Sequence, residues 1–352
     1  MKHFSDKIIH WYQQNKRDLP WRNTKDAYLI WLSEIILQQT RVDQGMEYYK
    51  KFATEFPTVK HLAKADNEKV MKLWQGLGYY SRARNLHTTS KIITEKFKGR
   101  FPDEYTDILS LKGVGEYTAA AIASFAFNKT HAVVDGNVYR VLARVFGIET
   151  PIDSMQGKKE FYRLANELID KKNPAIYNQA IMEFGAIQCK PVNPDCSVCP
   201  LNTMCFAYSK KRITELPVKA KKTKTRDRFF NYIVLQYNGK TAINKRVEKD
   251  IWINLYDFPL IETKKELTED QFLSSAEWLD FMKGNKYIVK NSSGTYKHIL
   301  SHQKIYARFW VIDCNKAFDK LIPKTAIIIK EKDIDTYPVS RLIEKYLQNK
   351  NH

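Results

Sequence analysis

Two acidic residues lie in sequence patterns that could make their carboxyl groups catalytic. Glu34 lies within an apolar helical pattern, and Asp135 follows the apolar, strand-like run at 132–134. Burial disfavours the charged form of a carboxyl group, so the pKa of Glu34 is expected to be raised, which suits a general acid near neutral pH. A Glu paired with a nearby Arg or Lys is the structural alternative for this position.

Asp135 precedes Gly136, Asn137 and a helix-prone segment, which is the usual place of an N-cap residue. Capping is therefore its structural alternative to catalysis. The helix dipole would favour the ionised form of Asp135. Two carboxylates whose environments separate their pKa values are typical of an acid paired with an anionic stabiliser.

Four of the five cysteines form the third candidate group. Their spacing is Cys189-x6-Cys196-x2-Cys199-x5-Cys205, with prolines at 191, 194 and 200 that disfavour helix. In a reducing compartment such spacing indicates a metal site more than disulfides. It favours an iron-sulfur cluster and leaves tetrahedral zinc open. Cys314 lies in a strand pattern and is expected to be an ordinary buried thiol.

Helices are the elements that would have to position these groups. Residues 1 to about 210 show apolar positions at three- and four-residue spacing. Asp26 is expected to cap a helix through about Thr40, and Pro174 to begin another. Gly113 and Gly115 predict a tight turn with positive φ before an Ala-rich helix, and its exposed backbone N–H groups could hold a phosphate.

The charge balance narrows the class of partner. The 352 residues contain 58 Lys and Arg against 39 Asp and Glu, a formal net charge of +19. This excess favours binding to a nucleic acid, although it would also serve solubility or attraction to a membrane surface. No apolar run of membrane-spanning length and no signal-peptide pattern is present, so we expect a soluble, cytoplasmic protein.

The periodicity changes in the second half of the chain. We expect a helical domain at 1–211, a basic, exposed linker at 212–228 and an α+β domain at 229–352. Strands are predicted at 229–237, 241–246, 252–261, 302–312 and 325–330. Helices are predicted at 268–282 and 339–348.

Several of these motifs together resemble a known family. The cysteine loop, the hairpin LKGVGEYTA and VDGNV are similar to the helix-hairpin-helix DNA glycosylases that carry a 4Fe-4S cluster. LPWR at 19–22, SEIILQQTRV at 33–42 and GLGYYSRARNL at 76–86 resemble the adenine DNA glycosylases of the MutY family. The resemblance implies one 4Fe-4S cluster on the four cysteines and a monomer acting on double-stranded DNA with 8-oxoguanine:adenine or guanine:adenine mispairs. If the source is bacterial, it also implies association with the nucleoid.

The resemblance also implies roles for individual residues. Glu34 would protonate the adenine leaving group, Asp135 would stabilise the oxocarbenium-like sugar, and Asn137 would help to position them. The residues implied for the adenine pocket are Trp21, Arg22 and Gln179, and those implied for DNA contacts are Gln39, Thr40, Tyr79, Gly113 and Gly115. An aromatic side chain such as Tyr79 could fill the gap left by an extruded base, although most tyrosines pack in a core.

Tyr117 separates two related activities. Family members with lyase activity carry a Lys at this position, whose amine forms a Schiff base, and a phenol does not. Lys112 lies before the glycines, outside the family position. A monofunctional enzyme that uses water is therefore predicted over a bifunctional glycosylase/lyase like endonuclease III. A non-catalytic DNA-binding protein is the third hypothesis.

The second domain resembles the NUDIX-like domain by which MutY relatives recognise 8-oxoguanine. The acidic hydrolysis motif of NUDIX enzymes is absent from the sequence, so recognition without hydrolase activity is expected. Leu300, Ser301 and His302 match a Phe-Ser-His loop that contacts the oxidised base, with Leu in place of the aromatic residue. A hairpin turn beside a strand is the structural alternative for these residues.

Overall fold

Helices build the first part of the chain, and an α+β arrangement follows, which confirms the predicted fold class. The structure is a computed structural model that describes residues 2–220, 225–314, 318, 321–322 and 325–350. Its contacts divide the chain into two units, Met1–Lys64 with Asn85–Lys221, and Ala65–Arg84 with Lys222–His352. The sequence pattern gives no sign that Ala65–Arg84 groups with the C-terminal unit.

Helices joined by loops build the first unit, and its described residues contain no strand. Its helical elements are α1 (Lys2–Asn15), η1 (Pro20–Arg22), α2 (Ala27–Leu37), α3 (Val42–Glu55), α4 (Val59–Lys64), most of α6 (Ser81–Lys96), α7 (Tyr105–Ser110), α8 (Glu116–Phe127), α9 (Gly136–Phe146), α10 (Met155–Leu168), α11 (Pro174–Glu183), η2 (Phe184–Gln188), η3 (Asn202–Met204) and α12 (Phe206–Ser209). None of the described helices is long and apolar enough to cross a membrane.

Local sequence signals set several of these helix ends. Asp26 caps α2 by accepting a hydrogen bond from the backbone N–H of Tyr28, and Pro174 occupies the first turn of α11. Both features match the sequence prediction. However, α2 ends at Leu37 rather than near Thr40, and Gln39 adopts a left-handed conformation with φ of 55°. The 132–134 run is not a strand, because the side-chain oxygens of Asn166 and Asn178 accept from its backbone N–H groups.

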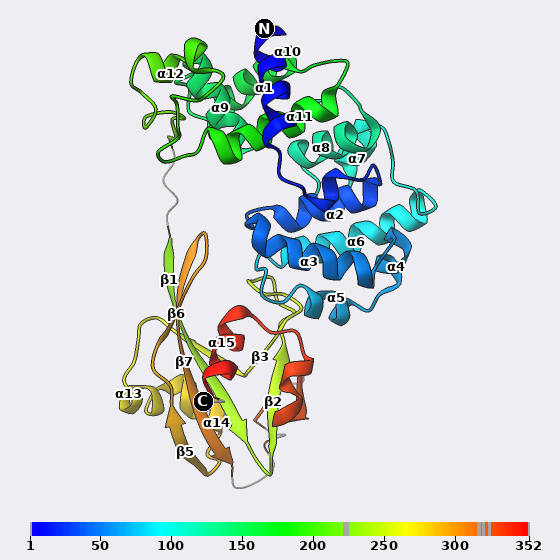
Figure 1. Ribbon diagram of the computed structural model, residues 1–352. Coiled ribbons are helices and arrows are strands. Elements are labelled where there is room, and N and C mark those ends of the chain that lie inside the picture. Colours follow the sequence, from blue (N-terminus) through cyan, green and yellow to red (C-terminus); the bar gives the residue numbers. More distant parts are fainter. Residues whose placement is uncertain (1, 221–224, 315–317, 319–320, 323–324, 351–352) are drawn as a thin grey trace. The chain divides into compact units, whose positions relative to one another are not determined.

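The helix α8 lies at the centre of the first unit because its side chains are small. Residues Thr118 to Ser124 are all buried, and four of them are alanines. Small side chains let neighbouring helices approach closely, and α2, α7 and α11 all pack against α8. In Figure 1, α8 and α7 lie side by side. This packing carries the C-terminal half of α2 to the same region as the ends of α8 and α11.

The second unit contains two sheets. The larger has the order β4-β1-β7-β5 with β6 also paired to β7, and the smaller has the order β3-β2-β8. The strands are β1 (Arg226–Gln236), β2 (Lys240–Lys245), β3 (Tyr256–Asp257), β4 (Leu260–Thr263), β5 (Tyr287–Ser292), β6 (Tyr296–Ile299), β7 (Gln303–Cys314) and β8 (Ala326–Lys330). The long strands β1 and β7 are parallel and run side by side in Figure 1.

Helices cover both faces of the larger sheet. Trp310 packs with Phe272 of α13 (Glu269–Leu273) and Trp278 of α14 (Ala276–Met282). The adjacent Phe309 stacks on Tyr346 of α15 (Arg341–Lys350) at 3.8 Å between ring centroids. Since successive side chains of a strand point to opposite faces, α15 lies on the face opposite to α13 and α14. The unit also contains α5 (Asn67–Leu73), the start of α6, and η4 (Glu331–Thr336).

The structure departs from the sequence prediction at several elements of this unit. The strand predicted at 252–261 is two short strands, because Trp252 and Asn254 adopt left-handed conformations before β3. The helix predicted at 268–282 breaks into α13 and α14, and Ser275 caps α14 through a bond from the Trp278 N–H. The strands β5 and β6 were not predicted, and both alternate only between exposed and half-buried positions.

Much of the predicted linker belongs to folded structure. Leu216 is buried, and the backbone carbonyl of Val218 accepts a hydrogen bond from the N–H of Ile152. Arg226 and Arg228 already belong to β1. Residues 221–224 of the predicted linker lie outside the described residues. A connection of a few residues therefore separates the last described contacts of the first unit from β1.

Candidate active site

A cavity of about 210 Å³ in the first unit collects the residues predicted for catalysis and for the base pocket. They come from distant parts of the sequence, so only the fold brings them together. Their roles stay predictions, whereas their proximity is a feature of the structure. The predicted residues in the cavity wall are Trp21, Arg22, Glu34, Thr40, Tyr117, Asp135, Asn137 and Gln179.

Glu34 lies in α2, where every residue from Ile30 to Ile36 is buried, and is itself only 7 % exposed. Its Oε2 accepts a 2.7 Å hydrogen bond from the hydroxyl of Tyr117. Burial raises the pKa of Glu34 to about 7, against the lowering effect of the Tyr117 bond, while the charge of Asp135 raises it further and Arg22 lowers it. Glu34 is therefore protonated for a large part of the time near neutral pH, as a general acid must be.

Asp135 is the N-cap of α9 and also lines the cavity. Its Oδ1 accepts from the backbone N–H of Val138 at 2.8 Å, and its Oδ2 accepts from the side-chain amide of Asn137 at 2.8 Å. Burial raises the pKa of Asp135 even though these bonds lower it. The cap bond does favour the ionised form, as expected of a helix N-terminus, but burial outweighs it and the net shift of the Asp135 pKa is upward.

Asn137 is held from two sides. It donates to Asp135, and its Oδ1 accepts a 2.9 Å hydrogen bond from Arg140. A Cβ at Gly185 would lie 2.6 Å from the Cβ of Asn137, which is too close for two carbon atoms. Only glycine therefore lets the segment after α11 pack this closely against Asn137. These contacts fix the amide of Asn137 beside the Asp135 carboxylate.

The cavity wall also contains a charged cluster that was not predicted from the sequence. Glu183 is 1 % exposed, and its Oε1 accepts from the backbone N–H of Arg17 at 3.0 Å and from Arg17 Nε at 2.8 Å. Its Oε2 accepts from Arg17 Nη2 and Arg22 Nη2, both at 2.7 Å. Like Glu34, Glu183 lies in an apolar helical pattern. This pattern could have marked Glu183 as a buried carboxyl group, but it gives no sign of the two arginines.

Two further predicted residues complete the pocket wall. Trp21 lies in the single turn η1 and packs its ring edge-to-face with Tyr49 at 5.2 Å. Gln179 of α11 accepts through Oε1 a 2.9 Å hydrogen bond from the hydroxyl of Tyr12. The amide nitrogen of Gln179 is thereby oriented by its neighbour, and an aromatic ring and an amide border the same cavity.

The glycine hairpin between α7 and α8 has the expected position but only partly the expected geometry. Gly113 has φ of 80°, and a Cβ there would lie 2.7 Å from Asn85. Gly115 has an extended backbone with φ of −99° and caps α8 without a side chain. Positive φ is thus required only at Gly113. No atom would meet a Cβ at Gly115 within 4 Å, so the space on the Cβ side of this residue is open.

The four clustered cysteines lie on one loop around a buried arginine. Arg144 donates to the carbonyls of Lys190 and Pro191 and approaches the Cys189 Sγ at 3.5 Å. Burial raises the pKa of the Cys199 thiol to about 11, and the other three thiols raise it further. Among the residues that the structure describes, no group of three or more Cys, His, Asp or Glu side chains is placed to hold a single metal ion.

Cys314 has no such setting. It is buried in the core of the second unit beside Trp310, and burial raises the pKa of its thiol to about 11. The structure therefore places it as an ordinary buried thiol.

A second pocket, of about 680 Å³, lies within the second unit. Leu300, Ser301 and His302 form the turn between β6 and β7 in its wall, and the Leu300 N–H donates to the Gln303 carbonyl at 2.8 Å. Tyr79 lines the same pocket, is 48 % exposed, and has φ of 47°. Its hydroxyl lies 3.0 Å from the Ser301 Oγ. The predicted aromatic wedge and the predicted recognition loop therefore border one pocket.

The helical fold, the glycine hairpin and the buried carboxylates place the chain among base excision DNA repair proteins. Residues 32–171 match the HhH-GPD superfamily of base excision DNA repair proteins, and residues 231–349 match the NUDIX domain. An adenine DNA glycosylase of Buchnera aphidicola subsp. Schizaphis graminum is 36% identical over 300 residues, which cover 85% of this chain and 84% of that relative. The chain belongs to the adenine DNA glycosylase family.

Solved structures support the fold of the first unit. A thermostable thymine-DNA glycosylase is 32% identical, with a TM-score of 0.55, over 59% of this chain and 95% of its own. A trapped endonuclease III–DNA covalent intermediate is 22% identical, with a TM-score of 0.52, over 59% of this chain and 94% of that chain, and shares the fold.

Proposed function

We propose that this adenine DNA glycosylase removes adenine paired with 8-oxoguanine, or with guanine, from double-stranded DNA. The observation that carries the proposal is the cavity in which a carboxyl group with a pKa of about 7 lies near a second buried carboxylate. A base inside a duplex is out of reach of such a cavity, so the adenine has to be extruded into it. The basic balance of the chain favours binding to phosphate, and the hairpin ends in Gly115 at the N-terminus of α8, where backbone N–H groups can hold an anion.

In the proposed reaction, Glu34 donates its proton to a ring nitrogen of adenine. The bond between C1′ and N9 then breaks, and its electron pair leaves with the base. The sugar becomes oxocarbenium-like, and the Asp135 carboxylate, held by Asn137 and by the Val138 N–H, stabilises the positive charge. Water adds to C1′ and loses a proton, which completes the hydrolysis.

Tyr117 supports hydrolysis without a lyase step. Its hydroxyl donates to Glu34 and it is buried, and its pKa is held well above the usual value by burial and by Glu34. A neutral phenol at this point positions the acid and forms no Schiff base. Borohydride trapping tests this proposal, because a strong covalent protein–DNA adduct would contradict it.

The pocket of the second unit is proposed to recognise the opposite base. 8-Oxoguanine carries an N7–H donor where guanine has an acceptor, and the Ser301 hydroxyl is a group that can accept from it. Ser301 and His302 are exposed at the turn, and Tyr79 lies beside them. We propose that this turn supplies the preference for 8-oxoguanine and that the enzyme acts as a monomer in the cytoplasm.

The cysteine loop is proposed to bind one 4Fe-4S cluster through Cys189, Cys196, Cys199 and Cys205. The residues suit such a group in their chemistry, because the four thiols lie near enough to act on one another electrostatically and the buried Arg144 guanidinium can offset the charge of thiolates. When bound, the cluster would cross-link the loop and could carry an electron. Iron analysis together with visible absorption tests the proposal, and zinc in place of iron would contradict it.

Single-turnover excision from an oligonucleotide duplex with one 8-oxoguanine:adenine pair tests the proposed function. We expect the wild type to release adenine and Glu34→Gln to release it far more slowly, because the amide has no acidic proton to donate. Equal release by the two proteins would contradict the proposed role of Glu34. Absence of release by the wild type would favour a non-catalytic DNA-binding protein.

A further inference from the structure

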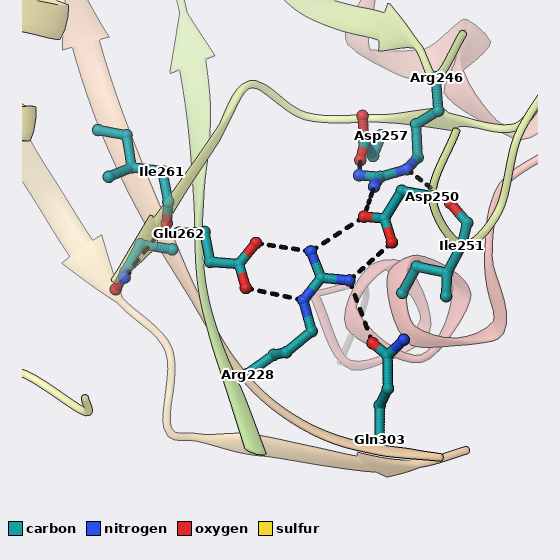
Figure 2. A network of polar contacts seen from close by, with 9 residues as sticks. Arg228, Arg246, Asp250, Ile251, Asp257, Ile261, Glu262 and Gln303 are labelled. Atoms are coloured by element: carbon teal, nitrogen blue, oxygen red, sulfur yellow. Dashed lines mark hydrogen bonds and ion pairs between the residues drawn. The ribbon is translucent and has the colours of Figure 1, made fainter. Parts of the chain in front are cut away.

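Arg228 of β1 is the centre of a polar network in the second unit, which Figure 2 shows from close by. Its side chain is 9 % exposed. Nε and Nη2 donate to the two carboxylate oxygens of Glu262 at 2.7 and 2.6 Å, and Nη1 and Nη2 donate to those of Asp250 at 2.8 and 2.9 Å. Nη1 also donates to the Gln303 Oε1 at 3.1 Å. A guanidinium has five N–H donors, and all five are engaged here.

The partners of Arg228 lie on three different segments. Glu262 belongs to β4, Asp250 lies in the loop between β2 and β3, and Gln303 is the first residue of β7. Asp250 and Gln303 also line the pocket of about 680 Å³. One guanidinium thus connects two segments that line that pocket, the loop at 249–252 and the start of β7 directly after the Leu300–His302 turn.

Further contacts make this arrangement rigid on both sides. Arg246 donates to Asp250 at 2.9 Å, to the buried Asp257 at 2.7 Å and to the carbonyl of Ile251 at 3.0 Å, as Figure 2 shows. On the other wall, the backbone N–H of Arg226 donates to the carbonyl of His302 at 3.1 Å. The turn that carries Ser301 is therefore tied at Gln303 and at His302 to the same strand.

We propose that Arg228 is a positioning residue that holds the Ser301–His302 turn at a fixed distance from the 249–252 loop and thereby sets the preference for 8-oxoguanine over guanine. This inference rests on the proposed function. Arg228 touches neither base in the proposal and acts through Gln303 and Asp250. Recognition by hydrogen bonds depends on placement, since a group shifted by about 1 Å loses much of its effect.

The test is the ratio of two single-turnover excision rates, measured on duplexes with an 8-oxoguanine:adenine and a guanine:adenine pair. In Arg228→Lys the charge remains, but an ammonium cannot engage Glu262 in a fork and also reach two other segments. We expect the ratio to fall about tenfold, with the guanine:adenine rate unchanged. A general loss of structure would lower both rates and leave the ratio as it was.

Two more variants make the result decisive. Gln303→Ala leaves the four carboxylate bonds of Arg228 and removes only its bond to Gln303. We expect this variant to lower the ratio by a smaller factor than Arg228→Lys does. It keeps the inference testable if Arg228→Lys folds poorly. Arg308→Lys in β7 is the control, because Arg308 contacts Glu266 and the Leu267 carbonyl and does not line the pocket. It should leave the ratio unchanged.

The outcomes separate the inference from the proposed function. A wild type without preference for 8-oxoguanine contradicts the proposed function of the turn. A wild-type preference that is retained in full by Gln303→Ala, or by Arg228→Lys with an unchanged guanine:adenine rate, overturns the positioning role. An equal fall in Arg308→Lys also overturns it, because the effect would then come from loosening of the sheet.

Discussion

Two buried glutamates that line one cavity show how the surroundings decide what a carboxyl group can do. Glu34 and Glu183 both stand in apolar helices and both line the cavity of the first unit. Burial raises the pKa of Glu34 to about 7, and a single hydrogen bond from Tyr117 opposes it too weakly. Burial acts on Glu183 as well, yet the hydrogen bonds from Arg17 and Arg22 outweigh it and lower its pKa to about 2.

The difference between them is the number of cationic donors. Glu183 accepts bonds from two guanidinium groups, whereas Glu34 accepts from a neutral phenol and lies near the charge of Asp135. Glu183 is therefore a permanent anion that fixes two arginines, and Glu34 is a group that can hold and release a proton near neutral pH. A buried carboxyl in an apolar helix is by itself no sign of an acid catalyst.

The largest expected effect is at Glu34. Glu34→Gln keeps the shape and the hydrogen bond to Tyr117 but removes the acidic proton. We expect single-turnover excision to fall by about 10² to 10⁴, the range that general acid catalysis supplies. The variant should still bind the substrate duplex with wild-type affinity, and a fall caused by lost binding would contradict the chemical role.

The next largest effect is expected at Glu183, on stability. Glu183→Gln leaves two guanidinium groups without their carboxylate, and removing one partner of a buried ion pair costs about 3 kcal/mol of unfolding free energy. Denaturant unfolding at neutral pH measures this loss. Arg163 and Glu167 form an exposed pair in the same unit, so Glu167→Gln is a matched control with little expected effect.

The stability difference at Glu183 should also depend on pH in a defined direction. Its folded-state pKa is lowered from the ordinary value of 4.5 to about 2. The stability from its ionised form is therefore complete above about pH 4.5 and is lost as the pH falls toward 2. The gap between wild type and Glu183→Gln should shrink over that range, and a constant gap would contradict the pairing.

A smaller effect is expected at Tyr117. Its hydrogen bond favours the ionised form of Glu34, so Tyr117→Phe should raise the pKa of Glu34 further and move the alkaline fall of the excision rate to higher pH. Below that fall, we expect the rate to drop by less than about tenfold, because the acid is kept. A pH–rate profile of the variant measures both, and a shift to lower pH would contradict the assigned direction.

The local signals in the sequence predicted the parts of the fold that depend on neighbouring residues. Asp26, Asp135 and Pro174 begin helices where the sequence places them, because capping and proline act within one turn. The strands β5 and β6 were not predicted, because neither shows the apolar alternation that is typical of a half-buried strand. Their pairing with β7 comes from the tertiary structure.

Residue patterns singled out Glu34 and Asp135, and the family resemblance named the other predicted residues of the cavity, but neither revealed the charged partners that set their chemistry. Glu183 meets Arg17 across 166 positions, and Arg228 meets Gln303 across 75. No periodicity or spacing connects residues so far apart. The net direction of the Asp135 pKa could not be predicted either, since its helix-capping position was visible in the sequence and its burial was not.

The pH dependence of single-turnover adenine excision by the wild type tests the central claim most directly. Glu34 has to be protonated to act as the acid, so the rate should fall about tenfold per pH unit above about pH 7. Asp135 has to be ionised, and its raised pKa should produce a second fall on the acidic side. A bell-shaped profile is therefore predicted on duplexes held at saturation. A rate that stays level or rises through pH 9 would contradict a protonated Glu34 as the group that releases adenine.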